Sequence, residues 1–273
     1  MRAPSNPRLI FLTTCVCLAA TLAYAQAPGP AGQKPFEPTV GQAGKDVVWV
    51  PTPQALVNKM LDMAKVTPSD FLMDLGSGDG RTVITAAKRG LRAMGIEYNP
   101  DMVELSKKNA AAAGVSDKAT FVKADIFETD FSKATVITLF LLPDLNLRLR
   151  PKILEMTPGT RVVSNSFRME AWEPDETETV SEDCVSWCTA LLWIVPAKVE
   201  GTWRLGQQDL TLSQQFQMLS GTLGSTPVSD ARMRGNLITF TAGGAQYTGQ
   251  VKGTTMEGTT KGGSGGSWTA TKK

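Results

Sequence analysis

Histidine is absent from the 273 residues of the chain. Its absence excludes a Ser-His-Asp or Cys-His nucleophile, a histidine metal site and an imidazole proton shuttle. We expect no metal site.

An excess of charge of one sign is also missing. The formal net charge is +2, and residues 1–25 hold two positive and no negative charges, so the rest of the chain is neutral. Without a basic field, we expect no nucleic-acid partner.

Long hydrophobic runs are missing too. The run near the N-terminus is short for a membrane span, which needs about 20 residues. Arg2 and Arg8 precede an apolar stretch at 9–22, and Ala-Tyr-Ala at 23–25 has the A-x-A form of a cleavage site. This order predicts a signal peptide at 1–25 and a mature start near Gln26. We expect a periplasmic or secreted protein with no membrane span after cleavage. An uncleaved N-terminal anchor is the alternative.

Cysteine is scarce, and two of the four cysteines, Cys15 and Cys17, lie within the predicted signal peptide. Cys184 and Cys188 remain. In an oxidising compartment this pair suits a small-loop disulfide, and the alternative is two buried thiols. The distance between the two Cα atoms decides between a disulfide and two thiols, and the sequence does not give that distance.

The rest of the chain is organised in three parts. Residues 26–45, rich in Pro, Gly and Gln, predict a flexible linker. Residues 46–196 alternate between strand and helix patterns, which predicts an α/β fold: a mainly parallel sheet with helices on both faces. Predicted strands lie at 71–74, 93–97, 120–124, 134–142 and 161–165, and predicted helices at 53–64, 81–89, 100–113 and 145–156. Thr52 is the expected N-cap of the first helix, and Pro151 disturbs the last.

Residues 197–273 are rich in Gly and Thr and have no helical period. Short apolar runs separated by glycines predict a small antiparallel β domain, a meander or partial barrel. Within it, only 261–266 is expected to be flexible. A disordered Gly-rich tail is the alternative.

The most informative stretch is Asp-Leu-Gly-Ser-Gly-Asp-Gly-Arg at 74–81. An apolar run ends in Asp74, three glycines (Gly76, Gly78 and Gly80) alternate with Ser77 and Asp79, and a helical pattern follows. Such a strand, tight turn and helix N-terminus lets a ligand approach backbone N–H groups. The spacing differs from the G-x-G-x-x-G of dinucleotide folds.

Three acids fall at the ends of consecutive predicted strands: Asp74, Glu97 and Asp125. Ligands of open parallel sheets bind at that edge. Glu97 suits the two hydroxyls of a ribose, because a carboxylate accepts two hydrogen bonds at once. Asp125 suits an adenine amino group, with Ile126 and Phe127 as an apolar wall. Asp74 lies under the loop, where it favours a positive charge.

The stretch at 74–81 resembles motif I of class I S-adenosylmethionine-dependent methyltransferases. Together with Val-Pro-Thr-Pro at 50–53, Gly-Ile-Glu-Tyr-Asn-Pro at 95–100 and Leu-Leu-Pro at 141–143, it resembles one bacterial group of these enzymes. That group is related to the mitochondrial ATP synthase c-subunit lysine methyltransferases and, more distantly, to Dot1-type histone lysine methyltransferases. The resemblance covers about residues 47 to 196. It implies a Rossmann-like class I methyltransferase sheet and S-adenosylmethionine as the cofactor.

The resemblance also implies roles for individual residues. Pro51 and Thr52 would line the methionine end of the cofactor, and the glycine loop would hold its carboxypropyl chain. Glu97, with Tyr98 beside it, would bind the ribose. Leu141 to Pro143 would flank the methyl group where the acceptor enters. The implied cofactor-binding set is Pro51, Thr52, Asp74, Gly76, Ser77, Gly78, Gly80, Glu97, Tyr98, Asp125, Ile126, Leu141 and Pro143.

The predicted function is that of an exported methyltransferase that N-methylates a protein lysine by in-line transfer, although a small-molecule acceptor is also open. Alignment and desolvation supply the rate of such a displacement, so no catalytic residue is assigned. Trp172, Trp187 and Trp193 are either a wall for the acceptor or core residues. Two alternatives are a non-catalytic envelope scaffold and a nicotinamide-dependent oxidoreductase, whose glycine spacing fits less well.

Overall fold

The computed structural model describes Met1, residues 36–263 and residues 265–273. The predicted signal peptide, its cleavage site and the linker up to residue 35 lie outside the described residues. The described elements all fall within the unit Phe36–Lys273.

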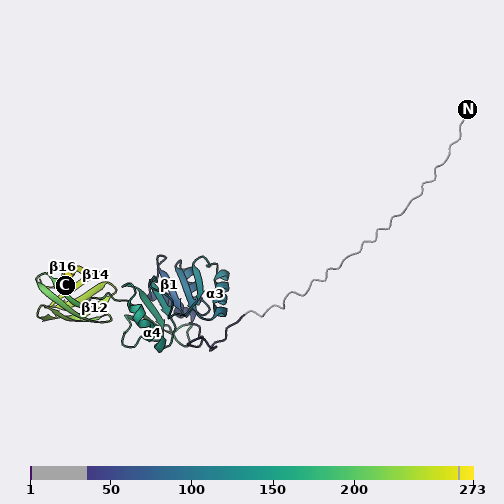
Figure 1. Ribbon diagram of the computed structural model, residues 1–273, viewed down its shortest axis with the longest axis horizontal. Helices are drawn as coiled ribbons and strands as arrows, with labels where there is room; N and C mark the ends of the chain where they lie inside the picture. Colours follow the sequence, from purple (N-terminus) through teal and green to yellow (C-terminus); the bar gives the residue numbers. More distant parts are fainter. Residues whose placement is uncertain (2–35, 264) are drawn as a thin grey trace. The chain divides into compact units, whose positions relative to one another are not determined.

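The first part of this unit is a seven-stranded sheet in the order β3-β2-β1-β4-β5-β7-β6 (Figure 1). Strands β1 to β5 are parallel, whereas β7 runs antiparallel to both β5 and β6. The strands are β1 (Phe71–Leu75), β2 (Arg92–Glu97), β3 (Ala119–Lys123), β4 (Val136–Leu139), β5 (Arg161–Asn165), β6 (Glu176–Thr179) and β7 (Thr189–Ile194). The predicted α/β fold is confirmed.

Four helices cover the two faces of the sheet: α1 (Gln54–Met63), α2 (Arg81–Lys88), α3 (Pro100–Ala112) and α4 (Pro143–Leu154). The side chains of β1 alternate between two cores. Leu72 packs with the apolar faces of α1, α2 and α3, whereas Met73 and Leu75 pack with α4. Because successive side chains of a strand point to opposite faces, a strand with apolar side chains on both faces requires cover on both sides.

The helix ends differ in detail from the prediction. Pro53, not Thr52, is the N-cap of α1, and no side chain caps that end. The hydroxyl of Thr52 instead accepts a hydrogen bond from Nδ2 of Asn165 at 3.3 Å. Helix α4 begins at Pro143, and Pro151 lies within it. Asn99 is the N-cap of α3, and its Oδ1 accepts the N–H of Asp101 at 2.9 Å.

The strand order reverses between β1 and β4. From β1 the chain proceeds to β2 and β3 on one side and then returns to β4 and β5 on the other. At such a switch point, the loops that leave the carboxyl ends of the two neighbouring strands diverge, and a crevice opens between them. The residues that follow β1 and β4 therefore define where a ligand site should lie.

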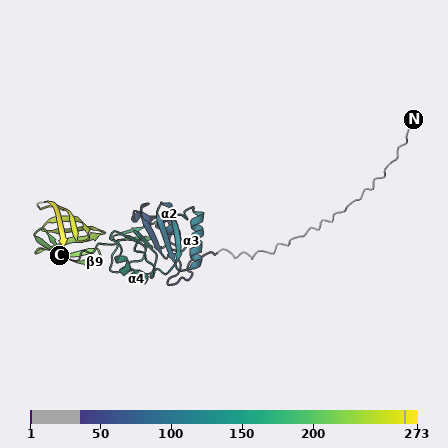
Figure 2. The same ribbon diagram turned by 45° about the horizontal axis from the view of Figure 1, so that its top comes forward.

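The second part of the unit is an antiparallel meander of nine strands. They are β8 (Gly201–Leu205), β9 (Gln208–Gln215), β10 (Met218–Leu223), β11 (Thr226–Pro227), β12 (Ser229–Arg234), β13 (Leu237–Ala242), β14 (Ala245–Lys252), β15 (Thr255–Lys261) and β16 (Gly266–Lys272). Strand β16 pairs with β8, and β9 pairs with β10, so the sheet closes into a barrel (Figure 2). Side chains such as Trp203, Phe240 and Met256 fill its interior.

One predicted stretch of this domain has different bounds in the structure. Residues 261–266 were expected to be flexible, but Lys261 and Gly266 belong to paired strands, with Thr260 opposite Gly266. The glycines serve the turn between the strands, where Gly262 has a φ of 87° that residues with a Cβ rarely adopt. Ser264 lies outside the described residues.

No helix within the described ranges is both long and apolar enough to cross a membrane.

Candidate active site

A cavity of about 240 Å³ lies at the carboxyl ends of the parallel strands. Its walls come from the loops after β1, β2, β3, β4 and β5, from the loop before β7 and from the segment before α1. Eleven of the thirteen expected cofactor-binding residues line it: Pro51, Thr52, Asp74, Gly76, Ser77, Gly78, Glu97, Tyr98, Asp125, Ile126 and Leu141. The structure thus brings together residues that are up to 90 positions apart in the sequence.

The other two expected residues are not among those that line the cavity. Gly80 is the N-cap of α2 with a φ of 81°, and a Cβ there would lie 2.7 Å from the ring of Phe121. Its lack of a side chain therefore serves the packing of the loop. Pro143 is the first residue of α4 and supplies the fixed φ that suits a helix start.

The glycine loop is held from two sides. The N–H groups of Gly76 and Ser77 both donate to the carbonyl of Ile96, at 2.9 and 3.0 Å. From α3, the Ser106 hydroxyl donates to the Gly78 carbonyl at 2.9 Å and Nδ2 of Asn109 to the Asp79 carbonyl at 3.0 Å. With its carbonyls bound on the α3 side, the loop is fixed in one orientation towards the cavity.

Both carboxylate oxygens of Glu97 accept backbone N–H groups. Oε2 accepts from Gly78 at 3.0 Å, and Oε1 accepts from Asn99 at 2.9 Å. These bonds orient the carboxylate before any ligand arrives. Each oxygen has further lone-pair capacity, so the group can still accept hydrogen bonds from two neighbouring hydroxyls.

Asp74 is buried beneath the loop. Burial, which disfavours the charged form, raises the pKa of Asp74 to about 7, and the negative charges of Glu97 and Asp79 add to the rise. A hydrogen bond of 2.6 Å from the Thr138 hydroxyl acts in the opposite direction. A carboxyl with a pKa near neutrality loses its proton readily when a cation binds next to it.

Asp125 is already paired in the structure. Its Oδ2 contacts the Nζ of Lys45, and its Oδ1 accepts the N–H of Phe127 at 2.9 Å. The hydrogen bond from Lys45 is the main cause that lowers the pKa of Asp125, and the same contact raises the pKa of Lys45. Nζ of Lys45 also lies 4.9 Å from the centre of the Tyr98 ring. Sequence reasoning missed Lys45, because nothing local ties it to a residue 80 positions away.

Lys45 belongs to a short hairpin, so the last part of the predicted linker at 26–45 is folded. The N–H of Gly41 donates to the Trp49 carbonyl at 2.8 Å, and the N–H of Trp49 donates to the Gln42 carbonyl at 2.9 Å. Ala43 and Val48 form a bridge between the two arms. Because residues 42–52 line the cavity, the last part of the predicted linker forms a wall of the site.

An aromatic cluster of Phe140, Phe167 and Trp187 lines the same cavity. The ring centres lie 6.0 Å apart for Phe140–Phe167, 6.1 Å for Phe140–Trp187 and 5.1 Å for Phe167–Trp187. Of the three tryptophans considered from the sequence, Trp172 and Trp193 are core residues and Trp187 lies at the cavity. Phe140 and Phe167 follow β4 and β5, and that position was the signal that could have found them.

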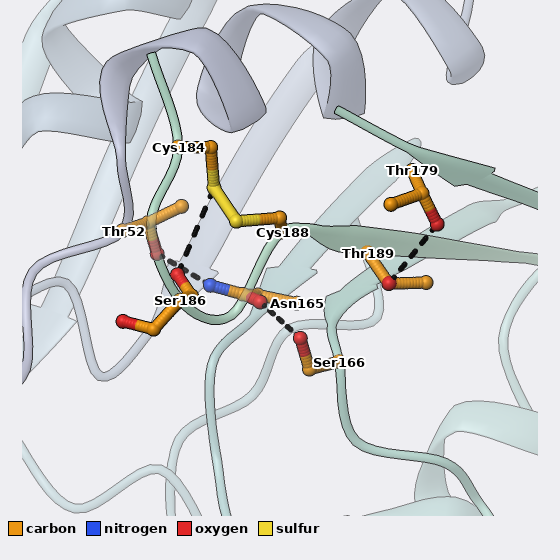
Figure 3. The surroundings of a disulfide bond; sticks show 8 residues. All are labelled: Thr52, Asn165, Ser166, Thr179, Cys184, Ser186, Cys188 and Thr189. Atoms are coloured by element: carbon orange, nitrogen blue, oxygen red, sulfur yellow. Dashed lines mark hydrogen bonds between the residues drawn. A yellow bond between two sulfur atoms is a disulfide. The ribbon is translucent and has the colours of Figure 1, made fainter. Parts of the chain in front are cut away.

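The two remaining cysteines form a disulfide beside this cluster. Cys184 and Cys188 are bonded, with their Cα atoms 5.8 Å apart. This decides between the disulfide and the pair of buried thiols. The surroundings of the bond include Thr52 and Asn165, which are hydrogen bonded to each other (Figure 3).

Comparison with known proteins decides the family. A model of the ANTKMT methyltransferase domain matches residues 74–176. A protein-lysine N-methyltransferase of Saccharolobus islandicus is 45% identical over 139 residues, which cover 50% of this chain and 86% of that protein. The chain belongs to this family of methyltransferases. It is also 39% identical to the ATP synthase c-subunit lysine N-methyltransferase of Mus musculus, over 42% of this chain and 47% of the mouse protein.

One solved structure of the family carries the fold argument. It is described as an RNA methyltransferase from Salinibacter ruber in complex with S-adenosyl-L-homocysteine, and it is 47% identical, with a TM-score of 0.52. The match covers 55% of this chain and 96% of that one. The resemblance to class I methyltransferases is confirmed, and the cofactor of this methyltransferase is S-adenosylmethionine.

The cavity suits that cofactor on its own features. The Ser77 hydroxyl is buried in the cavity wall and has no hydrogen-bond partner within the described part of the chain, so it can serve a polar ligand group. Asp74 and Glu97 supply negative charge in the same cavity, which favours binding of the positively charged sulfonium and ammonium groups of the cofactor. Within the same described residues, no three Asp, Glu or Cys side chains are grouped to hold a metal ion.

Proposed function

We propose that this chain is an exported S-adenosylmethionine-dependent methyltransferase that N-methylates a lysine side chain of a protein. The observation that carries the proposal is the cavity in which Glu97, Asp74 and the glycine loop meet an aromatic, apolar mouth. The lysine methyltransferases among the relatives support the acceptor class.

The bound cofactor supplies an activated methyl group on a sulfonium, which departs as a neutral thioether. The residues of the chain bind and align the two reactants. Glu97 accepts the ribose hydroxyls, and Asp74 favours the positive charge of the methionyl end. Alignment of the acceptor with the methyl group then supplies most of the rate, and no histidine base is needed.

The acceptor amine must be neutral when it attacks. Phe140, Leu141 and Leu142 line the cavity next to β4. Apolar surroundings disfavour the charged form of an amine and lower its pKa. The lysine would therefore lose its proton to solvent inside the cavity, where the walls would hold its neutral amine towards the methyl group that the cofactor supplies.

The proposed export is supported by two features. The order of basic residues, apolar stretch and A-x-A site at 1–25 is typical of a cleavable signal peptide. The Cys184–Cys188 disulfide suits an oxidising compartment such as the periplasm or the exterior. N-terminal sequencing of the mature protein is expected to begin at Gln26, and an intact Met1 in the envelope fraction would contradict cleavage.

Two measurements test the activity. Isothermal titration is expected to show that the protein binds S-adenosylmethionine and S-adenosylhomocysteine but not NAD. Glu97→Ala is expected to lose this binding, and the exposed control Glu104→Ala is expected to keep it. Binding of NAD alone would favour the oxidoreductase, and binding of no cofactor would favour a scaffold.

The second measurement is transfer of a labelled methyl group to an envelope extract, split into protein, RNA and small-molecule fractions. Label is expected in lysines of the protein fraction. Label confined to RNA would contradict the lysine acceptor, and label that persists with the Glu97→Ala protein would mean that another enzyme transfers the methyl group.

A further inference from the structure

We infer that Trp187 is a specificity-determining residue for the acceptor and that the Cys184–Cys188 disulfide holds it at the mouth of the cavity. With Phe140 and Phe167, it forms an aromatic wall along which a cationic alkylamine side chain enters. This assignment rests on the proposed function, because it concerns the same site and an amine acceptor.

Trp187 occupies a loop that is closed twice. It lies in the turn of the β6–β7 hairpin, where the N–H of Val180 donates to the carbonyl of Cys188 at 2.9 Å. The disulfide closes a second, smaller ring of five residues around Val185 and Trp187. Figure 3 shows the disulfide and, to its right, the hydrogen bond between Thr179 and Thr189. The loop is thus tied covalently at its tip and by hydrogen bonds at its base.

The backbone of Trp187 is unusual. Its φ of 58° lies in the left-handed region, which a bulky side chain rarely adopts. Backbone outliers of this kind persist where the surrounding structure enforces them, and they concentrate at ligand sites. Trp187 also exposes 44% of its surface, although it is a large apolar residue. A strained and exposed tryptophan on a cross-linked loop is better explained by a ligand than by packing of the core.

The three rings come from neighbouring strands. Phe140 follows β4, Phe167 follows β5, and Trp187 precedes β7, which is the next strand in the sheet. Their ring centres lie between 5.1 and 6.1 Å apart, so they form one continuous wall. The same cavity holds Asp74 and Glu97. An acceptor that follows this wall therefore arrives on the side where the cofactor is expected.

The chemistry of the wall selects the acceptor. A cation is attracted to the face of an aromatic ring, most strongly to tryptophan. The methylene stem of a lysine packs on apolar surface while its ammonium remains polar. Glu182 and Asp183 are exposed and give the same loop a negative charge. A neutral chain of equal length gains only the apolar part of these interactions, so the wall discriminates in favour of an amine.

The disulfide gives a way to separate this role from cofactor binding. Neither Cys184 nor Cys188 lines the cavity, and the residues that orient Glu97 are on other loops. Opening the disulfide is expected to free Trp187 and to weaken acceptor binding. The affinity for S-adenosylhomocysteine is expected to stay unchanged.

The experiment follows the indole N–H signal of Trp187 by NMR in the full chain saturated with S-adenosylhomocysteine, with Trp187→Phe to assign the signal. The probes are Nα-acetyl-lysine methylamide and its neutral counterpart, Nα-acetyl-norleucine methylamide. The lysine probe is expected to shift the Trp187 signal at concentrations about twofold to thirtyfold lower than the norleucine probe, the range of a cation–π contact. Equal responses, or no response to either, would overturn the inference.

A second comparison tests the disulfide. Dithiothreitol is expected to abolish the lysine response of the native chain and to have no effect on a Cys184→Ser/Cys188→Ser variant, in which the response is already lost. Val185→Ala, in the same loop, serves as the control that retains it. Unchanged lysine binding after reduction would overturn the role of the disulfide. Titration of S-adenosylhomocysteine into each protein distinguishes these outcomes from failure of the proposed function, which alone predicts loss of cofactor binding.

Discussion

The backbone N–H of Gly78 donates to Oε2 of Glu97 over 3.0 Å, so the loop that ends β1 and the acid that ends β2 are directly connected. The bond has two consequences. It holds the glycine loop against the neighbouring strand, and it fixes the carboxylate that faces the cavity. The two sequence features most typical of a nucleotide-like site thus depend on each other.

Replacing Glu97 with Gln is expected to weaken S-adenosylhomocysteine binding by about tenfold to a hundredfold, the usual cost of losing hydrogen bonds to a charged acceptor. The amide of Gln has only one accepting oxygen, so either Gly78 or Asn99 loses its partner. Calorimetric titration measures the change. Glu104→Gln on the exposed side of α3 is the matched control, and equal affinities for the two variants would argue against a role of Glu97 in binding.

Replacing Asp74 with Asn is expected to stabilise the protein at neutral and alkaline pH. The folded-state pKa of Asp74, about 7, lies above the ordinary aspartate value of 3.8. The native state therefore binds more protons than the unfolded state between these values, and this residue lowers stability as pH rises through that window. The gain for Asn is expected to be absent below about pH 4 and to reach about 4 kcal/mol above pH 7.

Urea unfolding of the native chain and Asp74→Asn at pH 4 and at pH 8 measures that gain. A stability difference that is the same at both pH values would show that the Asp74 carboxyl is not desolvated in the native state. The variant is also expected to bind the cofactor weakly, because it lacks the negative charge.

Cofactor affinity is expected to rise with pH around neutrality. A bound sulfonium or ammonium favours the ionised form of Asp74, so binding releases a proton from this residue when the pH is below its pKa of about 7. The affinity for S-adenosylmethionine is expected to be about tenfold lower at pH 6 than at pH 8. Calorimetry in buffers of different ionisation enthalpy detects the released proton. The same pH dependence in Asp74→Asn would assign the proton to another group.

Replacing Gly95 with Ala is expected to destabilise the protein by about 1–3 kcal/mol, the usual cost of overpacking. A Cβ at position 95 would lie 2.5 Å from Oγ of Ser77 and 2.7 Å from the Phe121 ring. Thermal unfolding measures the loss. Adding Ser77→Gly, which removes one of the two clashes, is expected to recover part of it. A double variant no more stable than the single one would mean that the Ser77 contact is not the cause.

The glycine loop, Glu97 and Asp125 could be placed from the sequence because the carboxyl ends of adjacent parallel strands share one edge. Phe140 follows β4 directly, so the same argument could have found it, and Trp187 was one of three tryptophans considered for the acceptor wall. Lys45 could not be placed, because it meets the site through a contact with Asp125, 80 positions away. The closure of the barrel between β16 and β8 could not be decided for the same reason, since a meander and a barrel have the same local pattern.

The hairpin at 41–49 sets a limit on how far the N-terminus can be shortened. Trp49, which closes it, lies against Gly78, where an added Cβ would come within 2.6 Å of the indole nitrogen. A protease that cuts after residue 49, or an expression plasmid that starts there, would leave every strand and helix in place. It would nevertheless remove one side of the cavity together with Lys45. Recombinant versions should therefore start before Phe36, and a shortened protein that folds normally is no guarantee of an intact site.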